Sequence, residues 1–197
     1  MSAFLGCSTA FAQSPQPNPE KVISKDLIES VRSWIDTDVV RESIVAQNRR
    51  YAAISQDEVD ALDKQWRAER EADDKPLIAA TLSNPLSVYL NRVQGRSLGM
   101  FFEIIVMDDK GLNVGQSAVT GDFWQGDEAK FQKTFPEGGM EAFIDEAEWD
   151  EEFKIWRAQL NIPVYDKSGS KKIGAATVEI NLTEAQRRFG SQPQDAF

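Results

Sequence analysis

The order of two patterns along the chain limits its fold more than any other feature. Before about residue 98, apolar residues recur every three to four positions, and from Gly99 onward short runs of β-branched and aromatic residues replace them. The first pattern is the period of an amphipathic helix, and the second is typical of strands. Helices followed by paired strands predict an α+β protein with an antiparallel sheet.

The helical part of the chain divides into three predicted helices. A long helix covers residues 22–49, a second covers residues 56–72, and a shorter third begins at Pro85. Ser55 and Glu58 have the spacing of a capping box at the start of the second helix. Pro85 occupies the first helical position, where proline costs no hydrogen bond.

The strand part of the chain contains two predicted hairpins. Residues 100–107 and 112–119 flank an Asp-Asp-Lys-Gly turn, and residues 153–165 and 172–181 flank an Asp-Lys-Ser-Gly-Ser turn. One further strand is expected around residues 140–144. We therefore expect a long N-terminal helix and additional helices to pack on a five-stranded antiparallel sheet.

The same patterns divide the chain into four segments. Residues 1–20 are a signal-peptide remnant with a Pro-rich linker, residues 21–98 a helical region, residues 99–190 the sheet domain, and residues 191–197 a tail. A short helix starting at Thr183 closes the sheet domain.

The N-terminal stretch predicts export. Its small and apolar residues end in Ala10-Phe11-Ala12 before Gln13, which resembles a signal-peptidase cleavage site, although an ordinary flexible N-terminus is the alternative. Cys7, the single cysteine, falls within this stretch. We therefore expect a periplasmic protein whose folded part has no disulfide.

Composition excludes several classes of function. The chain of 197 residues carries a net charge of −10, which disfavours nucleic acid and anionic membranes as partners. It has no histidine, the commonest general base and metal ligand. Seven carboxylates lie within residues 141–152, but they lack the order of a calcium loop and predict a solvated acidic face or a docking surface. We expect no enzyme, no catalytic residue, no cofactor and no metal site.

Three stretches resemble one protein family. The run PVYDKSGSKKIGAATVEINLTEA from Pro163 resembles the end of Cache domains, which are PAS-like extracytoplasmic sensor domains. The run FFEIIVMDDKGLNVGQSA from Phe101 resembles the first hairpin of that family, and GDFWQGDEAKFQKTF from Gly121 resembles the loop and short helix of a single-domain Cache subgroup. The resemblance covers roughly residues 85–185 and implies a PAS-like sheet.

The resemblance also implies a function. A free-standing Cache domain would be a non-catalytic periplasmic protein that binds a small ligand, signals to a membrane-bound sensor kinase or chemoreceptor, or does both. Receptors of this family have flanking membrane helices and a signal-transmitting region, and neither is recognised in this sequence. We therefore expect this chain to bind or sense a ligand without transmitting the signal itself. A homodimer through the N-terminal helix is expected by analogy with the family. The alternative is a ligand-free interaction module that docks through its acidic insertion and long helix.

The resemblance implies a pocket in front of the sheet, between the strands and the insertion at residues 120–150. Side chains alternate across a strand, so one face carries Ile155, Arg157, Gln159 and Asn161, and the other carries Trp156, Ala158, Leu160 and Ile162. The second set is the predicted core. Arg157 and Gln159, together with Glu103 of the first strand, are expected either to line the pocket or to face solvent.

The insertion contains the second group of candidate binding residues. Trp124 with Asp122 and Asp127 would bind a cationic or hydroxylated ligand through stacking and charge-assisted hydrogen bonds. The structural alternative is that Trp124 anchors the loop on the sheet while Asp127 caps the following helix. The two uses are compatible, because a packed tryptophan also forms a pocket wall.

Overall fold

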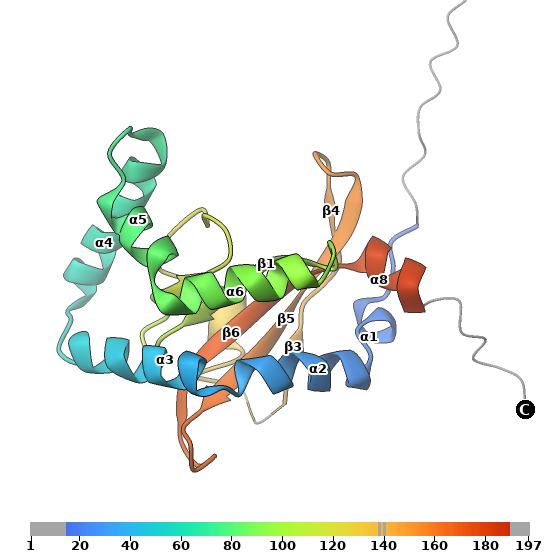
Figure 1. The fold of residues 1–197 in the computed structure, drawn as a ribbon, viewed down its shortest axis with the longest axis horizontal. Coiled ribbons are helices and arrows are strands. Elements are labelled where there is room, and N and C mark those ends of the chain that lie inside the picture. The colour runs from blue at the N-terminus through green and yellow to red at the C-terminus, as the bar shows by residue number, and fades with distance from the viewer. Residues whose placement is uncertain (1–14, 138, 140, 190–197) are drawn as a thin grey trace, which may run out of the picture.

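A computed structural model describes residues 15–137, 139 and 141–189 of the chain (Figure 1). Residues 1–14 of the predicted N-terminal segment, with Cys7, the predicted tail and Met140 lie outside the described residues. In the described part, helices precede a sheet and a short helix follows it, as the order of patterns predicts.

Between residue 15 and the sheet there are six helices: α1 (Pro19–Val22), α2 (Lys25–Ile35), α3 (Asp38–Arg50), α4 (Gln56–Glu71), α5 (Pro76–Ser83) and α6 (Pro85–Arg96). The predicted capping box is present, because Ser55 accepts from the Glu58 backbone N–H and Glu58 accepts from that of Ser55. At the start of α6, the Asn84 side chain accepts from the Ser87 backbone N–H at 2.8 Å. Helix α5 was not predicted: Pro76 follows the end of α4, but it also begins a new helix.

The long helix predicted over residues 22–49 is interrupted. Between α2 and α3, Thr37 is extended with φ −120° and ψ 157°. Its hydroxyl donates to the Trp34 carbonyl at 3.2 Å, and the Tyr89 hydroxyl of α6 donates to the same carbonyl at 2.8 Å. These bonds satisfy a carbonyl that would otherwise continue the helical ladder. Since both helices bury their apolar faces in the same core, the periodicity does not reveal the break.

The sheet contains β1 (Phe101–Met107), β2 (Asn113–Gln116), β3 (Phe143–Ile144), β4 (Glu148–Asp150), β5 (Ile155–Tyr165) and β6 (Lys172–Asn181). All pairs are antiparallel, in the order β2-β1-β6-β5-β3, and β4 also pairs with β5. Strands β3 and β4 follow each other along the same edge of β5, so six strands occupy the five predicted positions. The predicted α+β class is confirmed.

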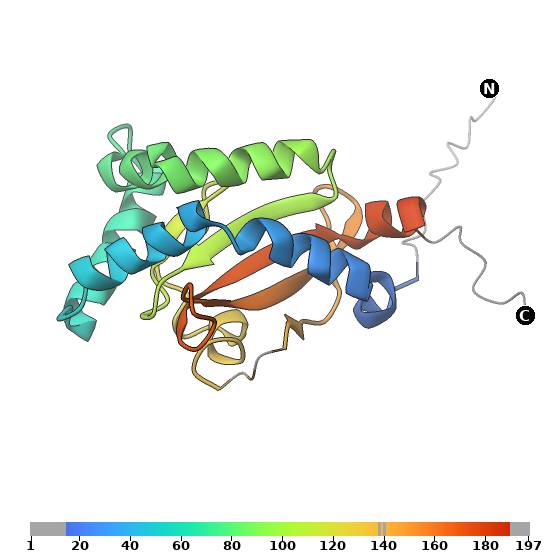
Figure 2. The same ribbon diagram turned by 60° about the horizontal axis from the view of Figure 1, so that its bottom comes forward.

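Helices cover one face of the sheet. Helices α2, α3 and α6 run along it (Figure 2), and their buried side chains form one core cluster with those of the sheet. Trp156, Ala158, Leu160 and Ile162 of β5 belong to this cluster, as the alternation predicts. We call this face the back of the sheet.

The insertion covers the other face, which we call the front. Its helix α7 (Ala129–Gln132) carries Phe131, which packs with Ile105, Met107 and Ala175 in a separate cluster. Helix α8 (Leu182–Phe189) ends the described chain and contacts α1 (Figure 1). A sheet with helices behind it and a loop segment in front leaves room for a site on the front face.

Candidate ligand-binding site

A cavity of about 230 Å³ lies on the front of the sheet. Its walls come from β5, β6, the start of α7 and the segment between β3 and β4. The charged and amide side chains that line it are Glu128, Lys130, Asp145, Glu146, Glu148, Arg157, Gln159 and Glu179. Five carboxylates and two cations therefore surround a space large enough for a few non-hydrogen atoms, which we call the front cavity.

Arg157 is a fixed wall of the front cavity. One guanidinium nitrogen lies 2.8 Å from Glu179 Oε2, and another lies 2.8 Å from Asp150 Oδ2. The guanidinium carbon lies 4.5 Å from the centre of the Phe102 ring, a cation–π arrangement. Because two carboxylates and an aromatic ring hold Arg157, its charge is largely compensated within the protein.

The other cation of the cavity is compensated in the same way. Lys130, whose side chain is only 10% exposed, has its Nζ 3.0 Å from Glu128 Oε2. Asp145 and Glu146 of the segment between β3 and β4, and Glu148 of β4, also line the cavity. After these pairings, the cavity keeps an excess of negative charge.

Gln159 supplies an amide that is available to a ligand. It is half-buried in the cavity wall, and its side chain makes no hydrogen bond with any described part of the chain. An amide offers both a donor and an acceptor. Of the predicted site residues, the structure thus places Arg157 and Gln159 together in one cavity wall.

Glu103 lies beside the front cavity. A register irregularity in β1 between Phe101 and Glu103 places Glu103 opposite Glu179 of β6. Burial, and secondarily repulsion from Glu179, raises the pKa of Glu103 to about 7, although Lys130 and Arg157 oppose this shift. Burial likewise raises the pKa of Glu179, while Arg157 opposes that increase. The pair therefore holds a proton more readily than ordinary carboxylates do.

We expect stability to depend on pH through Glu103. Because the pKa is higher in the native state than the ordinary value of 4.5, the stabilising contribution is complete below about pH 4.5 and is lost as the pH rises through about 7. Glu103→Gln should therefore be more stable than the wild type at pH 8, by at most about 3 kcal/mol. Urea unfolding at pH 5 and pH 8 measures the difference, and an equal effect at both values would contradict this assignment.

The structure places Trp124 away from the front cavity. Its ring N–H donates to the Lys110 carbonyl at 2.8 Å, and residue 124 forms a bridge with Leu112 after the first hairpin turn. Asp63 of α4 accepts from the backbone N–H groups of Phe123 and Trp124 at 2.8 and 3.1 Å. These contacts favour the structural alternative, in which Trp124 anchors the insertion.

The two aspartates near Trp124 also lie outside the front cavity. Asp122 accepts from the Gln125 amide at 2.6 Å and faces Arg67 of α4 at 3.5 Å. Asp127 is exposed and does not cap α7: the residue at the cap is Glu128, which makes no side-chain cap bond. The cap prediction was therefore wrong by one position, because α7 begins one residue later than the local pattern suggests.

Six charged residues that line the front cavity were not among the predicted site residues: Glu128, Lys130, Asp145, Glu146, Glu148 and Glu179. Lys130 was assigned no role, and Glu148 was counted only within the acidic run. Both reach the cavity through folding of the insertion onto β5, for example through the pairing of Glu148 with Arg157. In the described residues, no three acidic, histidine or cysteine side chains are arranged to hold a metal ion.

Solved structures with a similar fold are sensory domains. The sensory domain of the chemoreceptor Tlp3 of Campylobacter jejuni is 14% identical, with a TM-score of 0.42, over 85% of this chain and 63% of that one. The E. coli DcuS sensor domain is 20% identical, with a TM-score of 0.38, over 67% and 97%. This chain is similar in fold to these sensory domains. It spans less than two thirds of the matched Tlp3 chain.

A third similar structure is the ligand-binding domain of the amino-acid chemoreceptor PctC of Pseudomonas aeruginosa PAO1, solved with GABA. It is 14% identical, with a TM-score of 0.38, over 82% of this chain and 59% of that one. No family model matches the sequence, and the search of curated proteins finds no match. Among the described residues, no helix has the length and apolarity needed to cross a membrane.

Proposed function

We propose that this chain is a non-catalytic sensor domain that binds a small amine in the front cavity. The observation that carries the proposal is the front cavity itself, in which the amide of Gln159 faces carboxylates that exceed the cations. A ligand ammonium group would gain charge-assisted hydrogen bonds from Asp145 and Glu148, and a polar group beside it would bond to Gln159. The sequence resemblance to Cache domains supports a sensing role.

The proposal also covers the cellular location of the protein and its protein partner. The signal-like N-terminal stretch and the Cache resemblance support a periplasmic protein that presents its ligand state to a membrane-bound sensor kinase or chemoreceptor. The net charge of −10 suits a partner with a basic surface. The homodimer through the N-terminal helices remains part of this proposal.

Thermal-shift screening of small amines, organic acids and sugars tests the ligand class. A ligand that binds only the folded state at 100 times its Kd stabilises by about 2.7 kcal/mol. For a chain of this size that corresponds to a rise of roughly 5–10 °C in the melting temperature. We expect amines to give this rise and the other two classes to give none.

Two variants test whether the amine binds in the front cavity. Gln159→Leu and Glu148→Gln should abolish the rise while changing the melting temperature of the ligand-free protein by no more than about 2 °C, since Glu148 is exposed and the half-buried Gln159 side chain makes no hydrogen bond within the described chain. Glu141→Gln is the matched control, because Glu141 is an exposed acid of the same insertion outside the cavity lining. If no amine raises the melting temperature, or if Gln159→Leu keeps the full rise, the proposal fails.

A further inference from the structure

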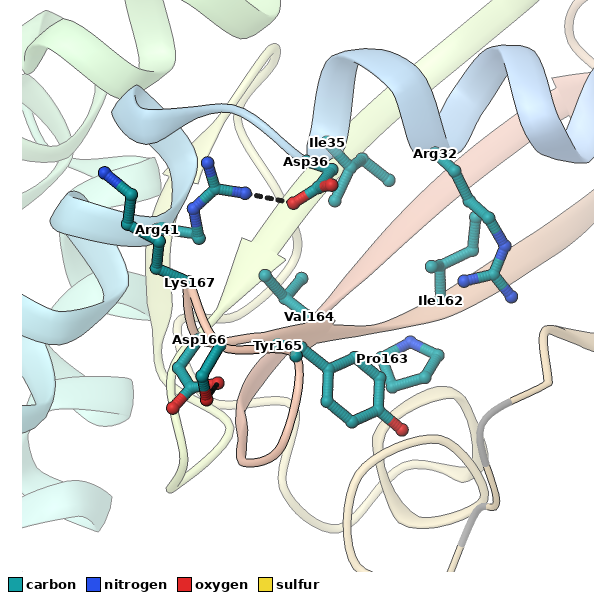
Figure 3. A pocket seen from close by; sticks show the side chains of 12 residues that line it. Arg32, Ile35, Asp36, Arg41, Ile162, Pro163, Val164, Tyr165, Asp166 and Lys167 are labelled. Atoms are coloured by element: carbon teal, nitrogen blue, oxygen red, sulfur yellow. Dashed lines mark hydrogen bonds and ion pairs between the residues drawn. The ribbon is translucent and has the colours of Figure 1, made fainter.

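A second cavity, larger than the front cavity, lies at the break between α2 and α3. Its volume is about 490 Å³, within the range of small-molecule sites. The helices border it on one side, and the end of β5 with the β5–β6 turn borders it on the other (Figure 3). We call it the hinge cavity.

The hinge cavity has an apolar floor. Ile35 comes from the end of α2, and Ile162, Pro163 and Val164 come from β5, with the half-buried Tyr165 beside them (Figure 3). Most of these side chains are buried in the core, so only part of their hydrocarbon surface faces the cavity. A branched or aromatic group would be stabilised there by the removal of this apolar surface from water.

The rim of the hinge cavity carries more positive than negative side chains. The cations Arg32, Arg41 and Lys167 come from α2, α3 and the β5–β6 turn, and the acids of the lining are Asp36 and Asp166. Figure 3 shows Arg32 on one side of the cavity and Arg41 with Lys167 on the other. Among the lining side chains alone, the charge balance is therefore opposite in sign to that of the front cavity.

The acids of this rim are already bonded within the protein. Asp36 is paired with Arg41, which also lies 2.9 Å from Asp38. Asp166 Oδ1 accepts from the Ser168 hydroxyl at 2.8 Å and from the Ser170 backbone N–H at 3.1 Å, so it stabilises its own turn. The charge of Asp36 is therefore largely compensated by Arg41, whereas Asp166 keeps its negative charge and is held in the turn.

Arg32 is the cation best suited to a bound carboxylate. Its side chain is 30% exposed, and its Nε lies 3.7 Å from Glu29, an acid that is 74% exposed. A guanidinium has five N–H donors in a planar fork, so it can keep its contacts within the protein and still bind a carboxylate. Lys167, exposed across the cavity, would add attraction without a fixed geometry.

We propose that the hinge cavity is a second binding site, for a small organic carboxylate with a branched or aromatic hydrocarbon part. The carboxylate would bind Arg32, and the hydrocarbon would lie on Val164 and Pro163. This site is independent of the proposed amine site, because β5 presents Arg157 and Gln159 to the front cavity but Ile162 and Val164 to this one.

Calorimetric titration of the full chain with phenylacetate tests the proposal. We expect saturable binding of phenylacetate, with 2-phenylacetamide, its neutral isostere, binding at least tenfold more weakly. Arg32→Gln should raise the Kd for phenylacetate at least tenfold, which equals about 1.4 kcal/mol. Lys167→Gln, in an exposed turn where folding is not at risk, should raise it two- to threefold.

Two control variants separate this site from the rest of the protein. Arg92→Gln removes an exposed arginine of α6 outside the hinge cavity and should leave the Kd unchanged. Gln159→Leu alters the front cavity and should also leave it unchanged. The proposal is overturned if phenylacetate does not bind, if Arg32→Gln and Lys167→Gln both bind it as the wild type does, or if Gln159→Leu abolishes binding. Failure of the amine screen would leave these outcomes unaffected.

Discussion

Replacing Gly174 by alanine is expected to destabilise the domain by about 3 kcal/mol or more. A Cβ atom at this position in β6 would lie 2.2 Å from the Met107 carbonyl oxygen and 3.2 Å from Ile44 Cγ2. The first contact is with the backbone of β1, which cannot move without disturbing the strand pairing between β1 and β6. Glycine at 174 is therefore required by the close approach of two backbones.

The matched control is the same substitution in an open position. Gly95 lies in α6 with no atom near its added Cβ, so Gly95→Ala should stabilise the protein by up to about 1 kcal/mol through helix propensity. Urea unfolding of both variants measures the two effects. Equal and small changes in the free energy of unfolding would show that the sheet adapts at residue 174.

Trp66→Ala should cost about 3–5 kcal/mol of stability, the usual range for removing a buried large aromatic side chain. Trp66 of α4 is fully buried, and its ring is stacked on Phe123 with the ring centres 5.3 Å apart. Its ring N–H donates to the Thr120 carbonyl at 3.0 Å. The side chain thus joins α4 to the start of the insertion.

Trp66→Phe separates packing from hydrogen bonding at this site. The phenylalanine keeps most of the aromatic contact but leaves the Thr120 carbonyl without its donor, so we expect a smaller loss of about 1–3 kcal/mol. Chemical denaturation followed by circular dichroism gives both values. If Trp66→Ala cost less than Trp66→Phe, the tryptophan would not be holding the insertion to α4.

Much of the fold is predictable because its determinants are local. The capping box at Ser55 and the alternation along β5 depend on residues a few positions apart, and both occur as predicted. The break at Thr37 could not be predicted, because it depends on a hydroxyl from Tyr89, far along the chain. Helix α5 was not predicted because a proline after a charged turn is equally compatible with the end of one helix and the start of another.

The site shows the same division between local and distant causes. Arg157 and Gln159 could be assigned to the front face, because strand alternation fixes which side they take. Whether Trp124 lies in the same site as Arg157 and Gln159 could not be decided from the sequence. The position of a residue within the insertion does not show which part of the protein the loop packs against. Asp63 of α4 determines this, and it lies some sixty positions earlier.

The alternation along β5 also limits how the length of the protein can change. Arg157 and Gln159 face the front, while Leu160 and Ile162 enter the core behind the sheet. Adding or deleting a single residue within this strand would exchange its front-facing and core-facing side chains. Charged side chains would then be buried in the core, and apolar core side chains would face the front. The turn at residues 151–154 is exposed and can absorb such changes. Related chains should therefore vary in length at this turn while β5 itself keeps a constant number of residues.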